Sequence, residues 1–219
     1  MNAVQDALAN QSLAPSLKIL LVLTILGLLP AIILATTSFV RIIVVLSFIR
    51  QGIGTAQSPP SQVLLGLAMF LTAFTMTPVV NEMKHVAYEP YAKGEIGDIE
   101  ALSRASVPLK QFMLRQTREA DLRLFYDATH TQLPATPDDV GLQLAVPAFV
   151  ISELTTAFQM GVVILLPFLV VDLAVSSLLM SMGMMMVPPS TLALPIKLVL
   201  FVLVDGWSLI AGSLLRSFS

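Results

Sequence analysis

Four charged side chains stand alone in a long apolar run that covers residues 146–215. They are Glu153, Asp172, Lys197 and Asp205. A charge on a membrane-spanning helix costs about 2.5–3.5 kcal/mol on insertion scales, so such groups are expected to face protein or water. These residues are the first candidates for chemistry, and they indicate that the chain is part of a larger assembly.

The spacing of these charges limits how they can pair. Lys197 and Asp205 lie about 12 Å apart along one helix and about 80° apart around it, so they cannot pair directly. Glu153 and Asp172 are also far apart on their helix. We therefore expect Glu153 to pair with Lys197, within one chain or between copies. A structural ion pair and a proton relay are both open, although the sequence offers no second carboxylate at hydrogen-bonding spacing.

Sequence motifs of hydrolysis and nucleotide binding are absent. The two histidines, His85 and His130, form no His-Glu-x-x-His pair, and there is neither a Gly-x-Ser-x-Gly motif nor a phosphate-binding glycine loop. The absence of cysteine excludes disulfides and thiolate metal sites. We therefore expect no enzymatic activity, no metal and no cofactor, and we interpret both histidines as solvated loop residues.

Composition places the chain among membrane proteins. Hydrophobic residues make up 56% of the chain and charged residues 12%, whereas a soluble domain has about a quarter charged residues. The net charge of −2 gives no basic patch for nucleic acid. The 219 residues leave room for several membrane-length helices and one polar segment, but not for a separate catalytic domain.

Residues 17–81 are expected to form a first apolar helical hairpin. Its first helix covers residues 19–40, which carry no charge and include Pro30 as the expected kink. The second helix is expected to begin at Ser58-Pro59-Pro60, which is typical of a helix start, and to end near Pro78. Residues 1–16 contain no basic residue and no cleavable pattern, so either a signal peptide has been removed or none existed.

Residues 82–145 form the polar segment and are expected to be extracytoplasmic and helical. Residues 89–97 are rich in glycine and charge and are expected to loop. An amphipathic helix is predicted to start at Ser106-Val107-Pro108. Surface pairs are expected between Arg115 and Glu119 and between Arg118 and Asp121, because each pair has helical spacing.

Residues 146–219 are expected to form a second apolar hairpin with a methionine-rich loop. One helix is predicted from about Pro147 to Met180 and another from about Pro195 to Arg216. Between them, Met184, Met185 and Met186 lie between a glycine and a pair of prolines. Methionine is flexible and polarizable, so these side chains either seal a shared channel axis or fill gaps between helices, and composition does not separate the two interpretations.

Several stretches closely resemble the FliP family of flagellar export-gate proteins, and the resemblance covers nearly everything from Leu17 to the end. The matching stretches are Ser38-Phe39-Val40-Arg41-Ile42, residues 55–62, residues 112–119, residues 147–154, residues 181–189 and residues 194–207. The resemblance implies an all-α fold of kinked hairpins that assemble into a ring, in the family a pentamer, with FliQ, FliR and further export-apparatus proteins. It places the ring at the bacterial inner membrane in the flagellar basal body, with much of it on the periplasmic side.

The resemblance also assigns roles to residues of this chain. Met184, Met185 and Met186 match the pore gasket, and Glu153 and Lys197 match buried charges between subunits. Arg41, Asp172 and Asp205 are further candidates for buried charges, and Phe112 and Phe125 are expected to support assembly. The implied function is passage of unfolded flagellar proteins across the lipid membrane. A proton-coupled or small-molecule transporter subunit is the alternative, and a scaffold without a conduit is a third interpretation.

Overall fold

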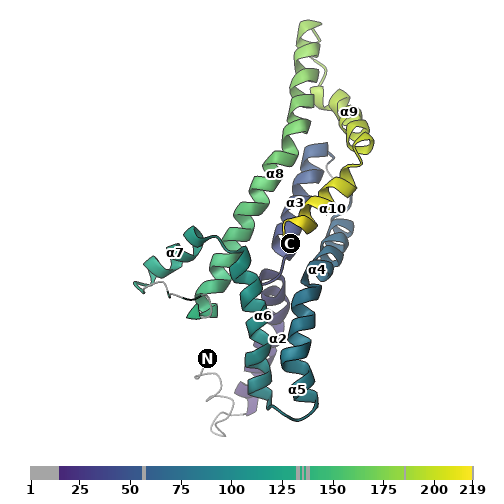
Figure 1. Cartoon of the computed structure of the whole chain (residues 1–219). Helices are drawn as coiled ribbons and strands as arrows, with labels where there is room; N and C mark the ends of the chain where they lie inside the picture. The colour runs from purple at the N-terminus through teal and green to yellow at the C-terminus, as the bar shows by residue number, and fades with distance from the viewer. Residues whose placement is uncertain are drawn as a thin grey trace.

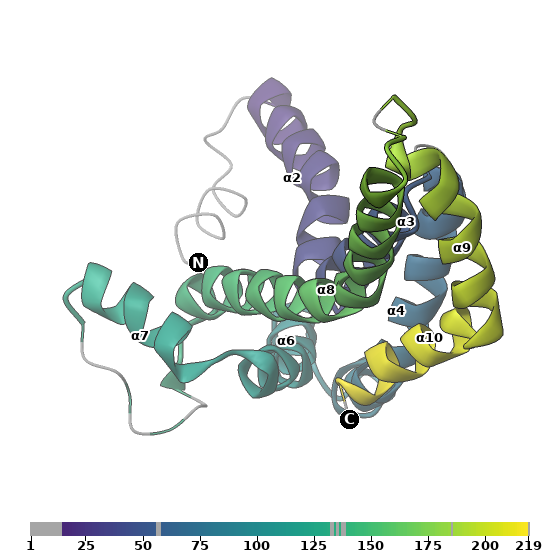
Figure 2. The ribbon, with the colours of Figure 1, turned by 90° about the horizontal axis from the view of Figure 1, so that it is seen from above.

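The computed structural model describes residues 15–55, 58–131, 134, 136, 139–184 and 186–218. These residues form helices and connecting turns, with no strand in the described part of the chain, which confirms the predicted all-α fold. The chain is elongated, with α8 as its longest element and α2 at the back of the molecule (Figure 1, Figure 2). Residues 1–14, most of the predicted N-terminal segment, lie outside the described residues.

The first apolar helix is divided in two, which corrects the predicted single helix over residues 19–40. Helix α2 spans Pro15–Ala35 and includes Pro30, and α3 spans Phe39–Ile53 at an angle of 66° to it. The break falls at three hydroxyl residues, 36–38, where the Thr36 hydroxyl donates to the Ile32 carbonyl. Hydroxyls that bond nearby carbonyls compete with the helix, so the corner forms here rather than at the proline.

The second apolar helix is longer than predicted. Helix α4 spans Ser61–Met83, passes through Pro78 and continues through the π-helical turn η1, Lys84–Tyr88, into α5, Glu89–Ala92. The predicted end near Pro78 is therefore wrong, as is the predicted loop from residue 89, which begins only after Ala92. At 1.5 Å per residue the 32 residues from Ser61 extend about 48 Å, well beyond the roughly 30 Å of a hydrocarbon core.

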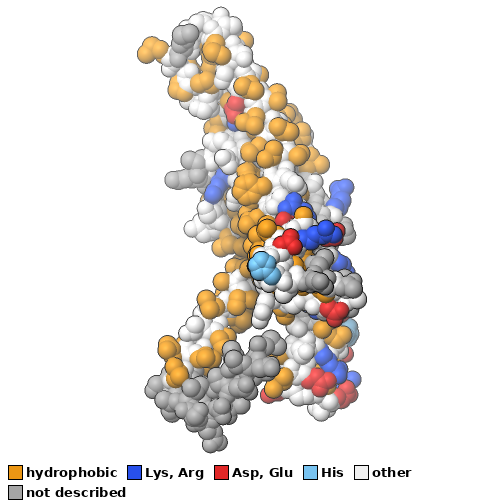
Figure 3. Space-filling model, turned by 90° about the vertical axis from the view of Figure 1, so that its left-hand side faces the viewer, with side chains coloured by type: hydrophobic (Ala, Val, Ile, Leu, Met, Phe, Trp, Pro, Cys, Tyr) orange, Lys and Arg blue, Asp and Glu red, His pale blue; other side chains and the backbone are white. Residues whose placement is uncertain are grey.

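The polar segment turns back along this rod. Helix α6 spans Asp98–Gln116 and packs against α4 and η1, and α7 spans Glu119–Ala128 and packs against α8. The predicted start of α6 at residue 106 is wrong, because Asp98 and Glu100 already occupy a favourable acidic first turn at residue 98. On the face shown in Figure 3, charged side chains gather over the middle and the lower right of the molecule, whereas hydrophobic side chains cover the upper arm.

Helix α8, Leu142–Ser181, is the spine of the fold. Helix α3 packs along it, and the approach is close because Gly52 and Gly161 carry no side chain where the rings of Phe168 and Phe48 lie. The resulting core contains buried residues from five helices: Ile42, Val45, Leu46, Ile49, Leu64, Ala68, Ala157, Phe168, Phe201, Ile210 and Leu214. Two helices of the described chain, residues 61–92 and 142–181, are long and apolar enough to cross a membrane, and each bent pair could add one span.

The last apolar segment is also two helices, which corrects the predicted single helix up to Arg216. Helix α9 spans Pro189–Leu203 and α10 spans Gly206–Arg216, with an angle of 63° between them. At the bend Asp205 adopts the left-handed conformation, with φ 48° and ψ 54°. Aspartate tolerates that conformation better than branched residues do. The next residue, Gly206, leaves room for the Phe201 ring, which a Cβ at this position would meet.

Candidate functional site

A buried arginine joins four parts of the chain. Arg41, in α3, is 3% exposed, and its guanidinium makes a two-pronged ion pair with Glu153 of α8, which is completely buried. Its Nη1 donates to the Ser217 carbonyl at 2.9 Å, and its Nη2 donates to the Gln116 side chain of α6 at 3.0 Å. The guanidinium also lies 4.0 Å from the ring centre of Phe218. We call these five residues the Arg41 clamp.

Arginine suits this position for geometric reasons. Its planar fork offers five donors, so one side chain can satisfy a carboxylate, an amide, a backbone carbonyl and an aromatic face at once. A buried carboxylate without such a partner would be strongly destabilising. The clamp therefore fixes the corner between α6 and α7, the end of the chain after α10, and the crossing of α3 and α8.

A second network lies beside the clamp on α8. Ser152 Oγ donates to Asp121 Oδ2 at 2.5 Å and accepts from the Arg118 backbone N–H at 3.0 Å, so it anchors the start of α7. Arg118 also pairs with Asp121 at 2.8 Å, as the helical spacing indicated. The Arg118 side chain is the main cause that lowers the pKa of Asp121 below its ordinary value. Glu119 pairs with Arg123 instead of Arg115, so that expected pair is wrong.

The expected pair between Glu153 and Lys197 does not form within the chain. Glu153 is occupied by Arg41, and Lys197 Nζ donates to Asp172 Oδ2 at 2.6 Å. Lys197 lies beside Asp172, which is about 28 Å from Glu153 along α8 by helical rise, so Lys197 cannot reach Glu153 in the same chain. A role of Lys197 and Glu153 between subunits remains a prediction, although Glu153 is fully enclosed by its own chain.

The other expected buried carboxylates are less buried in the chain than the sequence suggested. Asp172 has a side chain that is 40% exposed, and Asp205 is exposed at the bend between α9 and α10. Asp205 belongs neither to the Arg41 clamp nor to the pair of Asp172 with Lys197. Its conformation at the bend, rather than a charge partner, accounts for its place in the fold.

The methionine turn, described at residues 182–184 and 186–188, lies between α8 and α9. Gly183 adopts φ +73°, its N–H bonds the Met180 carbonyl at 3.1 Å, and the Met184 N–H bonds the Leu179 carbonyl at 2.9 Å. This is the double hydrogen bond of a glycine-terminated helix. Pro189 then begins α9 at a position where a missing N–H costs nothing.

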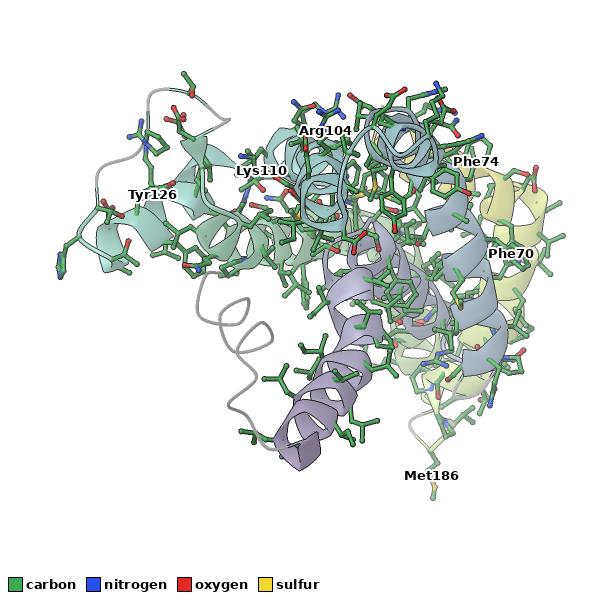
Figure 4. All side chains as sticks on the ribbon, turned by 90° about the horizontal axis from the view of Figure 1, so that it is seen from below. Phe70, Phe74, Arg104, Lys110, Tyr126 and Met186 are labelled. Carbon is green, nitrogen blue, oxygen red and sulfur yellow. The ribbon has the colours of Figure 1, made fainter. Side chains whose placement is uncertain are left out.

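The described methionines of this turn are exposed to different degrees, and Met186 points away from the rest of the chain. Met184 is 40% exposed and Met186 is 97% exposed, and Met186 extends beyond every neighbouring element in Figure 4. Met185 lies outside the described residues. Within one chain, Met186 fills no gap between helices.

The two aromatic candidates lie inside or against their own chain. Phe112 is 4% exposed and packs against Phe149 and Phe218, with ring centres 6.0 and 6.3 Å away, whereas Phe125 is half-buried on α7. Phe112 thus packs against the Phe218 ring, which in turn contacts the Arg41 guanidinium. A role of either residue in assembly remains a prediction.

The two histidines are remote from these networks. His85 lies in the π-helical turn, where its Nδ1 is 3.2 Å from a Glu89 carboxylate oxygen, and it is largely exposed. His130 follows α7 in an exposed turn. The described residues include no group of three or more histidine, cysteine, aspartate or glutamate side chains that could hold a metal ion.

Sequence reasoning missed three members of the clamp, namely Gln116, Ser217 and Phe218, and it missed the anchoring role of Ser152. Gln116 carried a signal, because it occupies the apolar stripe of its helix, where an amide is out of place unless it has a partner. Ser152, directly before Glu153, is a polar residue within an apolar helix and carried a similar signal. The two C-terminal residues carried none.

The chain matches a known protein family along most of its length. The FliP family matches residues 22–214. The flagellar biosynthetic protein FliP of Pectobacterium carotovorum is 51% identical over 209 residues, which cover 95% of this chain and 81% of that protein. The protein of the same name from Bacillus subtilis is 48% identical over 208 residues, which cover 95% of this chain and 94% of the relative. That of Caulobacter vibrioides is 50% identical over 196 residues, which cover 90% of this chain and 74% of the relative. The match along almost its whole length means that the chain belongs to the FliP family.

Proposed function

We propose that the chain is a pore-forming subunit of a flagellar protein export gate in the bacterial inner membrane. In this proposal several copies form a ring, a pentamer by family resemblance, with FliQ and FliR, and unfolded flagellar proteins pass along its axis. The chain performs no chemistry itself, and other parts of the apparatus supply the energy. The family membership and the flagellar names of the relatives support this role.

One observation carries the pore proposal, namely the exposed methionines at the tip of an apolar hairpin. Met186 is almost wholly exposed and Met184 partly exposed, so both are available to side chains from other copies. Several flexible thioether side chains at one axis would exclude ions and still deform around a passing chain. The Schellman-type glycine turn at Gly183 and the prolines that follow hold the turn at the hairpin tip.

Ion conductance of the assembled particle tests the proposal. Replacing Met184, Met185 and Met186 with alanine should raise leak, because the seal loses most of its side-chain volume. Met69→Ala is the matched control, since Met69 is 56% exposed on α4, away from the turn. Unchanged leak in the turn variant would contradict the pore role.

The same assay addresses the alternative of a small-molecule or proton-coupled transporter subunit. In that case the charged residues, rather than the methionines, would control transport, and the turn variant would behave like the Met69 control. An image of the purified oligomer addresses the third interpretation, because a scaffold would show no axial channel. Outward, lipid-facing positions for Met184 and Met186 in that image would also contradict the gate.

A further inference from the structure

One ion pair ties the two arms of the α8–α9 hairpin below the methionine turn. Lys197 on α9 donates to Asp172 on α8 at 2.6 Å. By helical rise, Asp172 lies about 13 Å before the end of α8 at Ser181, and Lys197 lies about 12 Å after the start of α9 at Pro189. The pair therefore links the arms at matching depth, directly beneath the turn.

Little else holds this part of the hairpin together. A small apolar cluster of Val175, Leu179 and Ala193, with Val171 and Val187 beside it, fills the space between the pair and the turn. Among the residues that the structure describes, the pair is the only polar side-chain link between α8 and α9. The position of the turn thus depends on one small apolar cluster and one ion pair.

The surroundings of Lys197 keep its ammonium in place. Lys197 is 6% exposed and lies beside the C-terminal end of α3, where a Cβ on Gly54 would be 3.8 Å from Nζ. Carbonyls at a helix C-terminus carry partial negative charge and favour a cation nearby. Lys197 consequently keeps a favourable environment on α3 even when Asp172 moves away.

Asp172, in contrast, has room to move. A cavity of about 310 Å³ opens beside the pair and is lined by Asp172, Lys197, Gln51, Gly54, Pro189 and Ser190. The Asp172 side chain is 40% exposed, so it can rotate into this partly polar space without disturbing the apolar cluster above it. Lys197 is buried and Asp172 is partly exposed beside a cavity, which is an arrangement that allows the contact to be released.

We propose that Asp172 and Lys197 are positioning residues that latch the methionine turn in its sealing position, and that passage of cargo requires the two to separate. The proposal rests on the sealing role of the turn proposed above. A partly exposed ion pair is weak, so its loss should raise the population of the displaced turn by about fivefold. Such a contact favours the closed position of the turn but is weak enough to break when cargo passes.

The test uses the purified ring and two readouts. Ion leak reports the seal, and the mobility of a spin label at Met186→Cys reports the turn itself, since the chain has no other cysteine. Asp172→Asn keeps the side-chain size and removes the charge, and it should raise both leak and label mobility. The charge swap Asp172→Lys with Lys197→Asp should restore both toward the original values.

Two controls separate a latch from general destabilisation. Asp205→Asn removes a carboxylate from the same apolar segment, outside the hairpin, and should change neither readout, because asparagine also tolerates the left-handed backbone. Glu153→Gln weakens the Arg41 clamp about 28 Å away along α8. It should lower thermal stability and leave label mobility unchanged.

The outcomes distinguish the latch from the gate. If the methionine-to-alanine variant raises leak while Asp172→Asn changes neither leak nor label mobility, the latch is overturned and the sealing role of the turn remains in place. Raised label mobility in Asp172→Asn, with no leak in either variant, would show that the pair holds the turn in place, but it would overturn the sealing role of the turn and the latch proposal that rests on it. If the Asp172→Asn ring does not assemble, the double variant with exchanged charges serves as the test. If that double variant assembles but shows a mobile label and raised leak, the latch is overturned.

Discussion

Replacement of Arg41 with methionine should be among the most destabilising single changes in this chain. The change removes the only cation that contacts Glu153 among the described residues, and it leaves that fully buried carboxylate without a charge partner. Breaking one side of a buried ion pair costs about 3–5 kcal/mol. For a chain of this length, 1 kcal/mol corresponds to about 2–4 °C, so the midpoint should fall by about 6–20 °C.

The double variant Arg41→Met with Glu153→Met makes the reasoning quantitative. Two apolar side chains of similar size replace the pair, and such replacements are often neutral or stabilising. We therefore expect the double variant to recover most of the loss. Thermal unfolding of the detergent-purified protein measures the midpoints of the original chain, the two single variants and the double variant. Limited proteolysis reports whether α7 has separated from α8.

The matched control is Arg123→Met, which breaks the exposed pair of Arg123 with Glu119 on α7. An exposed pair one helical turn apart contributes less than about 1 kcal/mol. If Arg41→Met costs no more than this control, or if the two clamp substitutions simply add, the clamp does not stabilise the fold as described.

Two further changes test packing and pH dependence. Gly161→Val places side-chain atoms where the Phe48 ring lies, so it should lower the free energy of unfolding by about 1–3 kcal/mol. The control Gly27→Ala places its Cβ in open space, so it should leave the stability unchanged or raise it by up to about 1 kcal/mol. Equal midpoints of thermal unfolding for the two variants would contradict the close packing of α3 on α8. Because Arg118 lowers the pKa of Asp121, the stability from this carboxylate is present above its unfolded pKa of about 3.9 and is lost as pH falls through the lower folded value. Asp121→Asn should therefore flatten the fall of the midpoint below about pH 4, and a curve parallel to that of the original chain would refute the assignment.

The apolar segments were predictable because their composition alone demands helices in a membrane. The start and end of α8 lie within a few residues of the predicted ones. The breaks were not predictable from the prolines, because Pro30, Pro78 and Pro108 all lie inside helices. The chain instead turns at the hydroxyls of residues 36–38 and at Asp205, where local backbone conformation and hydroxyl bonds matter more than the missing N–H of a proline.

The sequence also pointed to the charged residues that matter without indicating their partners. Arg41 was a candidate buried charge and is buried, but the sequence named no partner for it. Its partner Glu153 is 112 residues away in the sequence, and no spacing rule relates residues that far apart. Pairing of this kind depends on how helices cross, which a single sequence does not encode in any local pattern.

The composition of the Arg41 clamp also constrains the order of events during biosynthesis. The clamp joins residue 41 to residues 217 and 218, so it cannot close before the ribosome has released nearly all of the described chain. Arg41 can pair with Glu153 as soon as α8 has been made, whereas its hydrogen bond to Ser217 and its contact with the Phe218 ring form only later. A nascent chain that ends before residue 217 therefore holds Arg41 by its ion pair and by Gln116 alone, and the segment after α10 supplies the last two partners of the guanidinium.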